Sequence, residues 1–225
     1  MPTLTKDGVI WTLRLDEGEN RFTPAFLDFV HRTLDEVAES TEPSALVTVG
    51  ADKFFSNGLD LAWVIDNADK LASYVDRIHA MFAKVLTLPV PTVAAVNGHA
   101  FGGGAMLALA HDYRVMRSDR GFFCFPEADI DIPFTEGMNA LIQAKLTPRA
   151  QMATMTTGRR LTGPEAASLG VVDSVHALDD LLGAATALVE PLAGKKRSTL
   201  GTIKQVMFAD AARALLSPQP DDLKL

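Results

Sequence analysis

Hydrophobic and polar residues follow two different periods along this chain, and each period predicts its own kind of element. Runs rich in β-branched and aromatic residues predict strands at 9–15, 45–49, 92–96, 113–116, 121–125 and, as a short stub, 171–172. Stretches with apolar residues at helical spacing predict helices at 24–37, 65–88, 105–110, 138–145, 148–156, 164–169, 178–191 and 200–215. Because strands and helices alternate, we expect an α/β fold with largely parallel strand pairing.

Proline and glycine mark the places where several of these elements begin and end. Pro89 and Pro91 end the helical stretch 65–88, which is long enough for one or two helices. The segment 53–58 is expected to be a loop, and 97–104 is expected to be a glycine-rich turn. The strand before each of these segments is almost entirely apolar, which is typical of a strand buried on both faces.

The composition is that of an ordinary globular protein, and it excludes some classes of partner. Of the 225 residues, 48% are hydrophobic and 22% are charged, and the net charge is −7. A nucleic-acid-binding protein needs a basic surface, so no nucleic acid is expected as a partner. No apolar stretch approaches the ~20 residues that cross a bilayer, so no membrane partner is expected either.

The cysteine content and the two ends of the chain bear on its location. The single cysteine, Cys124, excludes an intrachain disulfide and suits a reducing compartment. The N-terminal residues lack the charged-then-apolar pattern of a secretory signal. The tail Leu223-Lys224-Leu225 resembles a peroxisomal address only weakly, because no small residue precedes the lysine. We therefore expect a cytoplasmic protein.

Two glycine-centred turns carry the strongest chemical signal. The first turn spans 54–61 and the second turn spans 96–105, and each connects a buried strand to a helix. Glycine lets a backbone approach a ligand closely, and the first N–H groups of a helix are free to bind an anion. Two such turns facing one point could hold the oxygen of a polarised carbonyl group. The chain lacks the dinucleotide motif G-x-G-x-x-G, the phosphate-binding Gly-Lys-Ser/Thr and the hydrolase motif G-x-S-x-G.

Four ordered segments together resemble the crotonase family, also called the enoyl-CoA hydratase/isomerase family. The first is F-S-N-G-L-D-L at 55–61, and the second is V-N-G-H-A-F-G-G-G-A-M-L-A-L-A-H-D-Y-R at 96–114. The third is R-G-F-F-C-F-P-E, which ends at Glu127, and the fourth is T-G-R-R-L-T-G-P-E-A-A-S-L-G-V-V-D at 157–173. The resemblance extends over about residues 9–175.

The resemblance implies a crotonase-like spiral of repeated ββα units that ends in helices. Residues 1–192 would form the spiral core, and 193–225 would form a shortened C-terminal helical region. The implied substrate is an acyl-CoA thioester, and the implied assembly is a homotrimer or a dimer of trimers. No metal ion and no organic cofactor is expected, because coenzyme A is part of the substrate.

The resemblance also implies roles for residues of the two turns and of the third segment. The backbone N–H groups of Leu59 and Gly103 are expected to form an oxyanion hole, with Glu127 as the catalytic acid–base group. The residues expected to contact the acyl chain or coenzyme A are Ser56, Asn57, Gly58, Leu61, Gly102, Met106 and Phe134. An apolar wall that would raise the pKa of a nearby carboxyl group is expected from Phe122, Phe123, Phe125 and Phe134.

The number of glutamates at the expected site indicates the reaction. Hydratases of the family carry one glutamate just after the glycine triplet and another at the end of the third segment. This chain has Met106 at the first place and Glu127 at the second. Addition of water uses one group to activate the water and one to protonate carbon, and loss of one acid costs a factor of about 10²–10⁴. A double-bond shift needs one acid. The chain is therefore predicted to be a Δ3,Δ2-enoyl-CoA isomerase of fatty acid β-oxidation, which converts 3-enoyl-CoA to 2-trans-enoyl-CoA.

Alternatives stay open for both the base and the reaction. Glu136 can be the base, a like charge that raises the pKa of Glu127, or a carboxylate that favours the start of a helix. One fold hosts many chemistries, so a weak hydratase, a thioesterase, a decarboxylase or a non-catalytic acyl-CoA binder is also compatible with the sequence.

Overall fold

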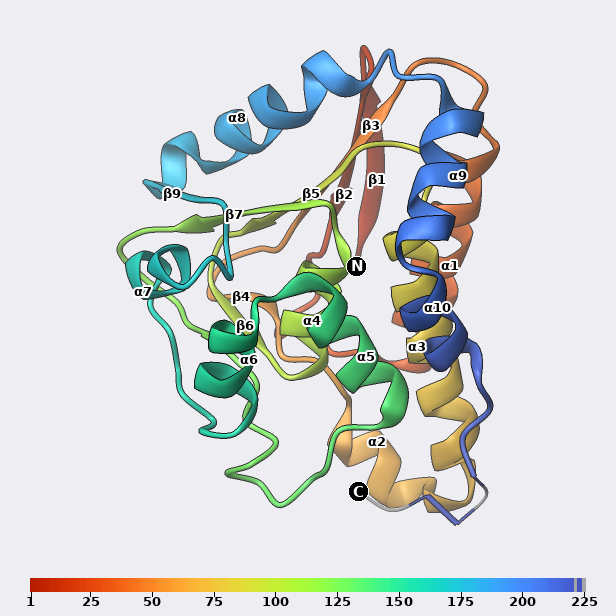
Figure 1. Ribbon diagram of the computed structural model, residues 1–225, viewed down its shortest axis with the longest axis vertical. Coiled ribbons are helices and arrows are strands. Elements are labelled where there is room, and N and C mark those ends of the chain that lie inside the picture. The colour runs from red at the N-terminus through yellow and green to blue at the C-terminus, as the bar shows by residue number, and fades with distance from the viewer. Residues whose placement is uncertain (221, 224–225) are drawn as a thin grey trace.

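The computed structural model describes residues 1–220 and 222–223, and it shows two β-sheets surrounded by helices (Figure 1). The larger sheet has the order β1 (Thr3–Asp7), β2 (Ile10–Arg14), β3 (Ala45–Val49), β5 (Thr92–Val96), β7 (Tyr113–Arg117) and β9 (Ser174–His176). The smaller sheet has the order β4 (Phe54–Ser56), β6 (His99–Phe101) and β8 (Phe123–Cys124). The pair β1–β2 is antiparallel, and the other neighbouring strands pair in parallel.

Helices follow most of the strands and pack around the sheets. Their bounds are α1 (Pro24–Glu39), α2 (Leu61–Asp66), η1 (Ala68–Lys70), α3 (Leu71–Thr87), α4 (Gly103–Ala110), α5 (Glu136–Lys145), α6 (Pro148–Met155), α7 (Gly163–Ser168), α8 (Leu178–Val189), η2 (Glu190–Leu192), α9 (Arg197–Met207) and α10 (Ala209–Leu216). Among the described residues, no helix has both the length and the apolar character needed to cross a bilayer. Lys224 and Leu225, which belong to the weak peroxisomal pattern, lie outside the described residues.

Three consecutive segments repeat a strand–strand–helix unit. They are β3–β4–α2, β5–β6–α4 and β7–β8–α5. In each unit the first strand joins the larger sheet, the second joins the smaller sheet, and the helix returns the chain. The predicted α/β class and the spiral of ββα units are thereby confirmed.

The larger sheet is buried on both faces because its central strands are apolar on both. Val47 and Val93 belong to a core cluster that includes Leu181 of α8. The neighbouring residues Leu46 and Ala94 point to the opposite face and belong to the main core, together with residues of α1, α3 and α4. Figure 1 shows α8 on one side of this sheet and α1 and α3 on the other.

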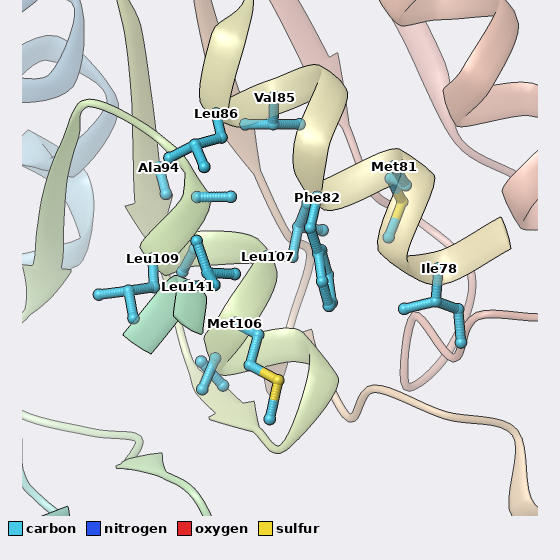
Figure 2. Packing of buried hydrophobic residues seen from close by; sticks show 14 of the residues in the cluster. Ile78, Met81, Phe82, Val85, Leu86, Ala94, Met106, Leu107, Leu109 and Leu141 are labelled. Carbon is cyan, nitrogen blue, oxygen red and sulfur yellow. The ribbon is translucent and has the colours of Figure 1, made fainter. Parts of the chain in front are cut away.

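Helix α4 lies inside the molecule, where it brings the second turn into the centre of the fold. All of its residues are buried, and several are Gly or Ala. Small side chains let the helix approach its neighbours closely, while Leu107 and Leu109 fill the space toward the surrounding core. Figure 2 shows these residues beside Phe82 and Leu86 of α3 and Leu141 of α5. The N-terminus of α4 is thus held rigidly against the core.

Several short elements differ from the sequence-based expectation. The edge strand β1 was not predicted, since its TLTKD sequence is mostly polar and exposed. Strands β4 and β6 lie within the segments that were expected to be a loop and a turn. Each strand has only three residues, which is too short to give a recognisable pattern, and the two strands pair with each other although they are far apart in the sequence. Short strands of this kind depend on partners that are distant in sequence.

Two further expectations were wrong. Val171 and Val172 are not a strand, because their N–H groups bond to Ala166 O at the end of α7, and the strand is β9 instead. The helix expected over 200–215 is two helices, since the chain changes direction at Phe208, where φ is −110° and ψ is 20°. This bend lets α10 pack against both α3 and α5.

Candidate active site

The two glycine-centred turns meet beside a cavity of about 200 Å³. Its walls come from the first turn, α3, the second turn, the segment after β8 and the start of α5. A larger cavity of about 650 Å³ lies against α9, but none of the residues expected at the site lines it. We therefore take the smaller cavity as the candidate active site.

The contact between the two turns is backbone against backbone. A Cβ atom added at Gly58 would lie 2.7 Å from Gly103 N, and one added at Gly104 would lie 2.1 Å from Ser56 O. No other residue type fits at these positions without a shift of the chain. Gly58 also has a φ of +71°, a conformation that favours glycine. The glycines are thus required for the turns to touch.

Leu59 and Gly103 each present a backbone N–H group at this contact. Within residues 1–220 and 222–223, neither N–H has a hydrogen-bond acceptor. Gly103 is the first residue of α4, where N–H groups lack a partner inside the helix and the helix dipole favours negative charge. Leu59 and Gly103 both line the cavity, so two residues with a free backbone donor border the same space. Free backbone donors at one point are the groups that an oxyanion hole uses.

Glu127 supplies the acidic group of the cavity. It follows β8, and it is only 8% exposed. Its Oε2 atom has no hydrogen-bond partner among the described residues. Burial raises the pKa of Glu127 from 4.5 to about 7. The carboxyl group is therefore available for proton transfer near neutral pH, as a general acid or base should be.

The apolar lining of the cavity differs from the one expected. The predicted rise in its pKa is confirmed, but Phe122, Phe123, Phe125 and Phe134 do not line the cavity. The apolar lining comes instead from residues such as Phe101, Ile130, Ile132 and Met138. Phe134 packs edge-on against Phe125, with ring centroids 6.2 Å apart. Burial of the Glu127 side chain is the first cause of its raised pKa.

Other expected contact residues divide into those that line the cavity and those that support it. Asn57, Leu61 and Gly102 line it. Ser56 is fully buried and does not line it, since its hydroxyl donates to Asn20 O at 2.7 Å and accepts from Gly58 N at 3.1 Å. The Ser56 side chain therefore shapes the first turn from behind.

Met106 and Glu136 also lie away from the cavity lining. Met106 is fully buried in the core, where Figure 2 shows it on α4 with the other packed side chains. Glu136 is exposed and is the first residue of α5, after the capping residue Thr135. The structure does not bring either side chain into the lining of the cavity.

Nine lining residues were not among the site residues expected from the sequence: Arg21, Val75, Phe101, Pro126, Ile130, Ile132, Pro133, Thr135 and Met138. Val75 and Met138 lie at helical spacing, so their pattern could not be distinguished from ordinary core positions. Arg21 and Thr135 reach the cavity only through the path of the chain between elements. The Arg21 guanidinium donates to Leu59 O at 3.1 Å, which connects it to the first turn.

Comparison with known proteins finds similar sequences and similar folds. The sequence profile described as Enoyl-CoA hydratase/isomerase matches residues 5–222. Enoyl-CoA delta isomerase 3 of Arabidopsis thaliana is 38% identical over 224 residues, covering 95% of this chain and 94% of that protein. The peroxisomal enoyl-CoA delta isomerase 2 of the same plant is 40% identical over 209 residues, covering 88% and 87%. An enoyl-CoA hydratase structure from Mycobacterium marinum superposes with a TM-score of 0.87 at 25% identity, covering 96% and 95%.

The fold is that of a crotonase-type ββα spiral. The chain belongs to the enoyl-CoA hydratase/isomerase family.

Proposed function

We propose that this protein is an enoyl-CoA isomerase of fatty acid oxidation, which converts 3-enoyl-CoA to 2-trans-enoyl-CoA. The relatives named enoyl-CoA delta isomerase, at 38% and 40% identity, support the reaction class. The observation that carries the proposal is Glu127, the single carboxylate in the described lining of the cavity. Its raised pKa, about 7, suits a group that both removes and returns a proton.

The proposed mechanism uses one carboxylate and two amides. The N–H groups of Leu59 and Gly103 hydrogen-bond the thioester oxygen. The Glu127 carboxylate removes a proton from C2, and the C–H electron pair enters a dienolate whose negative charge rests on that oxygen. The electrons then form the C2–C3 double bond while the protonated Glu127 delivers its proton to C4. The carboxylate is regenerated, and no metal or organic cofactor takes part.

Hydration is less compatible with this cavity because it calls for a second acid–base group. Met106 occupies the place of the first glutamate of the hydratases and is buried in the core. Glu136 is exposed at the helix start, where its charge is favoured by the helix dipole, and we assign it that structural role. One carboxylate suffices for the double-bond shift and not for efficient addition of water.

The same proposal includes the substrate contacts and the assembly. Asn57, Leu61 and Gly102 border the cavity and are proposed to contact the acyl-CoA, with Gly58 shaping the turn between them. A homotrimer or a dimer of trimers remains a prediction, which light scattering can measure. A cytoplasmic location also remains a prediction, and one of the relatives above is named as peroxisomal.

The test is to incubate the purified protein with 3-enoyl-CoA and follow the conjugated product by absorbance and mass. We expect a product of unchanged mass. Glu127→Gln should lower kcat by a factor of about 10² or more, because the amide cannot accept the proton. Glu136→Gln serves as the matched control and should stay within about twofold of wild type, since it lies outside the cavity.

Three outcomes would contradict the proposal. A product heavier by one water would identify a hydratase, and release of free coenzyme A would identify a thioesterase. Equal activity of Glu127→Gln and wild type would show that another group is the base. Loss of activity in Glu136→Gln alone would transfer that role to Glu136.

A further inference from the structure

The first turn presents four consecutive backbone N–H groups, and the protein occupies all but one. Asn57 N donates to Glu19 O at 2.9 Å, and Gly58 N donates to Ser56 Oγ at 3.1 Å. Asp60 N donates to the Tyr74 hydroxyl at 2.8 Å. Leu59 N has no acceptor in the described part of the chain. The Leu59 N–H group therefore remains free for a ligand, because the neighbouring N–H groups all have acceptors within the protein.

Two peptide planes flank Leu59, and both are held by hydrogen bonds. In the plane that joins Gly58 to Leu59, the carbonyl oxygen accepts from Phe22 N at 2.8 Å. Because a trans peptide is planar, its N–H points opposite to its C=O, so the Leu59 N–H points away from Phe22. In the plane that joins Leu59 to Asp60, the oxygen accepts from Arg21 at 3.1 Å and the N–H donates to Tyr74.

Tyr74 takes part in the support of both planes. Its hydroxyl accepts from Asp60 N and donates to Phe22 O at 2.9 Å, so one oxygen atom links the first turn to the segment that holds Gly58 O. The side chain is 2% exposed and comes from the rigid core helix α3. Its ring packs against Trp63, with centroids 5.0 Å apart. Burial raises the pKa of Tyr74 to about 12, so the hydroxyl keeps its proton and remains a donor.

We propose that Tyr74 is a positioning residue, which fixes the orientation of the Leu59 N–H group through Asp60 N and Phe22 O. The inference rests on the proposed function, in which Leu59 N stabilises the developing negative charge on the thioester oxygen. A donor must lie where charge develops, so a small rotation of its peptide plane weakens it. Tyr74 does not line the cavity, and it acts only through the first turn.

The test is Tyr74→Phe, which removes the hydroxyl and keeps the ring in contact with Trp63. We expect kcat for 3-enoyl-CoA to fall about tenfold, less than the 10²–10³ typical for complete loss of an oxyanion-hole donor. KM should change by less than about twofold, because the affected interaction strengthens in the transition state. The matched control is Tyr113→Phe, at the other tyrosine, whose hydroxyl makes no hydrogen bond within the described residues.

A second readout separates positioning from general loss of structure and does not depend on turnover. Hydrogen exchange at the Asp60 amide should accelerate in Tyr74→Phe and not in Tyr113→Phe. Butyryl-CoA, a saturated thioester that cannot isomerise, should shift the Leu59 amide NMR resonance of wild type. That shift should be reduced in Tyr74→Phe.

These results also distinguish the two proposals from each other. If wild type does not isomerise 3-enoyl-CoA but the Leu59 shift depends on Tyr74, the proposed function fails and the positioning role stands. If Tyr74→Phe keeps the wild-type kcat and the wild-type Leu59 shift, Tyr74 is merely a structural residue and the inference is overturned. An equal loss of kcat in both tyrosine variants would overturn it as well.

Discussion

At the residue scale, the proposed chemistry depends on a carboxyl group that is kept out of water. Glu127 is 8% exposed, and burial raises its pKa to about 7, because the charged form loses its hydration. The same burial leaves Oε2 without a partner among the described residues, so that atom is free for a substrate proton. The burial of Glu127 thus affects both its pKa and the free energy of unfolding of the protein.

The first prediction concerns the pH dependence of catalysis. The base form of Glu127 is the carboxylate, which predominates above a pH of about 7. We expect kcat/KM to rise about tenfold per pH unit below that value and to level off above it, since kcat/KM reports the free enzyme. Initial rates with 3-enoyl-CoA across this range measure the profile. A flat profile down to a pH of about 5 would contradict the raised pKa.

The second prediction concerns stability at the same residue. The unfolded chain has the ordinary glutamate pKa of 4.5, and the folded chain has about 7. The folded state therefore holds its proton more tightly, and the resulting stabilisation is present below pH 4.5 and is lost as the pH rises through about 7. Glu127→Gln carries no charge to bury, so it should be more stable than wild type above that pH, by on the order of 3 kcal/mol. Urea unfolding of both proteins at low and high pH tests the sign.

At the element scale, the site is a contact between two turns, in which Gly58 meets Gly103, 45 positions further along the chain. The sequence identified both turns, because each combines a buried strand, glycine and a helix start. It did not show that Gly104 lies under Ser56 O, or that α4 is completely buried. It also gave no indication that the Ser56 hydroxyl faces inward, because side-chain direction in a turn depends on what packs behind it. Arg21 and Thr135 were missed for the same reason.

The third prediction compares two glycine-to-alanine changes. In Gly104→Ala the new Cβ would lie 2.1 Å from the backbone oxygen of Ser56, so the two turns must move apart. We expect a loss of at least about 2 kcal/mol of stability together with most of the activity. In Gly183→Ala the added Cβ meets nothing within 4 Å, inside helix α8. This variant should gain about 0.5–1 kcal/mol and keep its activity.

Thermal and chemical unfolding, with turnover measured on the folded fraction, check the pair. Similar behaviour of the two variants would show that the close contact of the turns is not required. It would also remove the structural basis for an oxyanion hole shared between them.

At the scale of the whole molecule, the C-terminal helices are attached to the spiral by packing and by a buried ion pair. Helix α10 packs on α3 and α5, and Leu215 lies against Gly137 at the start of α5, close to the cavity. Lys204 of α9 is 4% exposed, pairs with Asp112 at 2.6 Å and donates to Val90 O at 2.7 Å. These contacts tie the C-terminal region to the strands of the larger sheet.

The fourth prediction tests that attachment. Lys204→Ala leaves the Asp112 carboxylate without its partner in a largely buried position, and should cost about 3 kcal/mol of stability. The control is Arg213→Ala, because the pair Arg213–Asp210 on α10 is 74% and 93% exposed, and such pairs contribute about 1 kcal/mol or less. Denaturant unfolding measures both. Equal losses of stability in the two variants would show that Lys204 does not anchor α9. The kcat of the folded Lys204→Ala protein should stay near that of wild type.

The sequence by itself determined the local features of this protein. Apolar periods located most strands and helices, glycine located the two turns, and the order of four segments indicated the family and Glu127. These features depend on residues close together in the chain, so their pattern is visible without a fold. The prediction of a raised pKa also followed from the expected burial of Glu127.

The tertiary structure decided which atoms of those residues face the cavity. It directs Met106 into the core, Ser56 toward Asn20 and Glu136 toward solvent, while it leaves the N–H groups of Leu59 and Gly103 free. It also breaks the last helix at Phe208, so that α10 can reach two other helices. Each of these outcomes depends on packing between segments that are distant in sequence. Neither the apolar period nor the spacing within a motif reveals such contacts, because both describe residues that are close together in the chain.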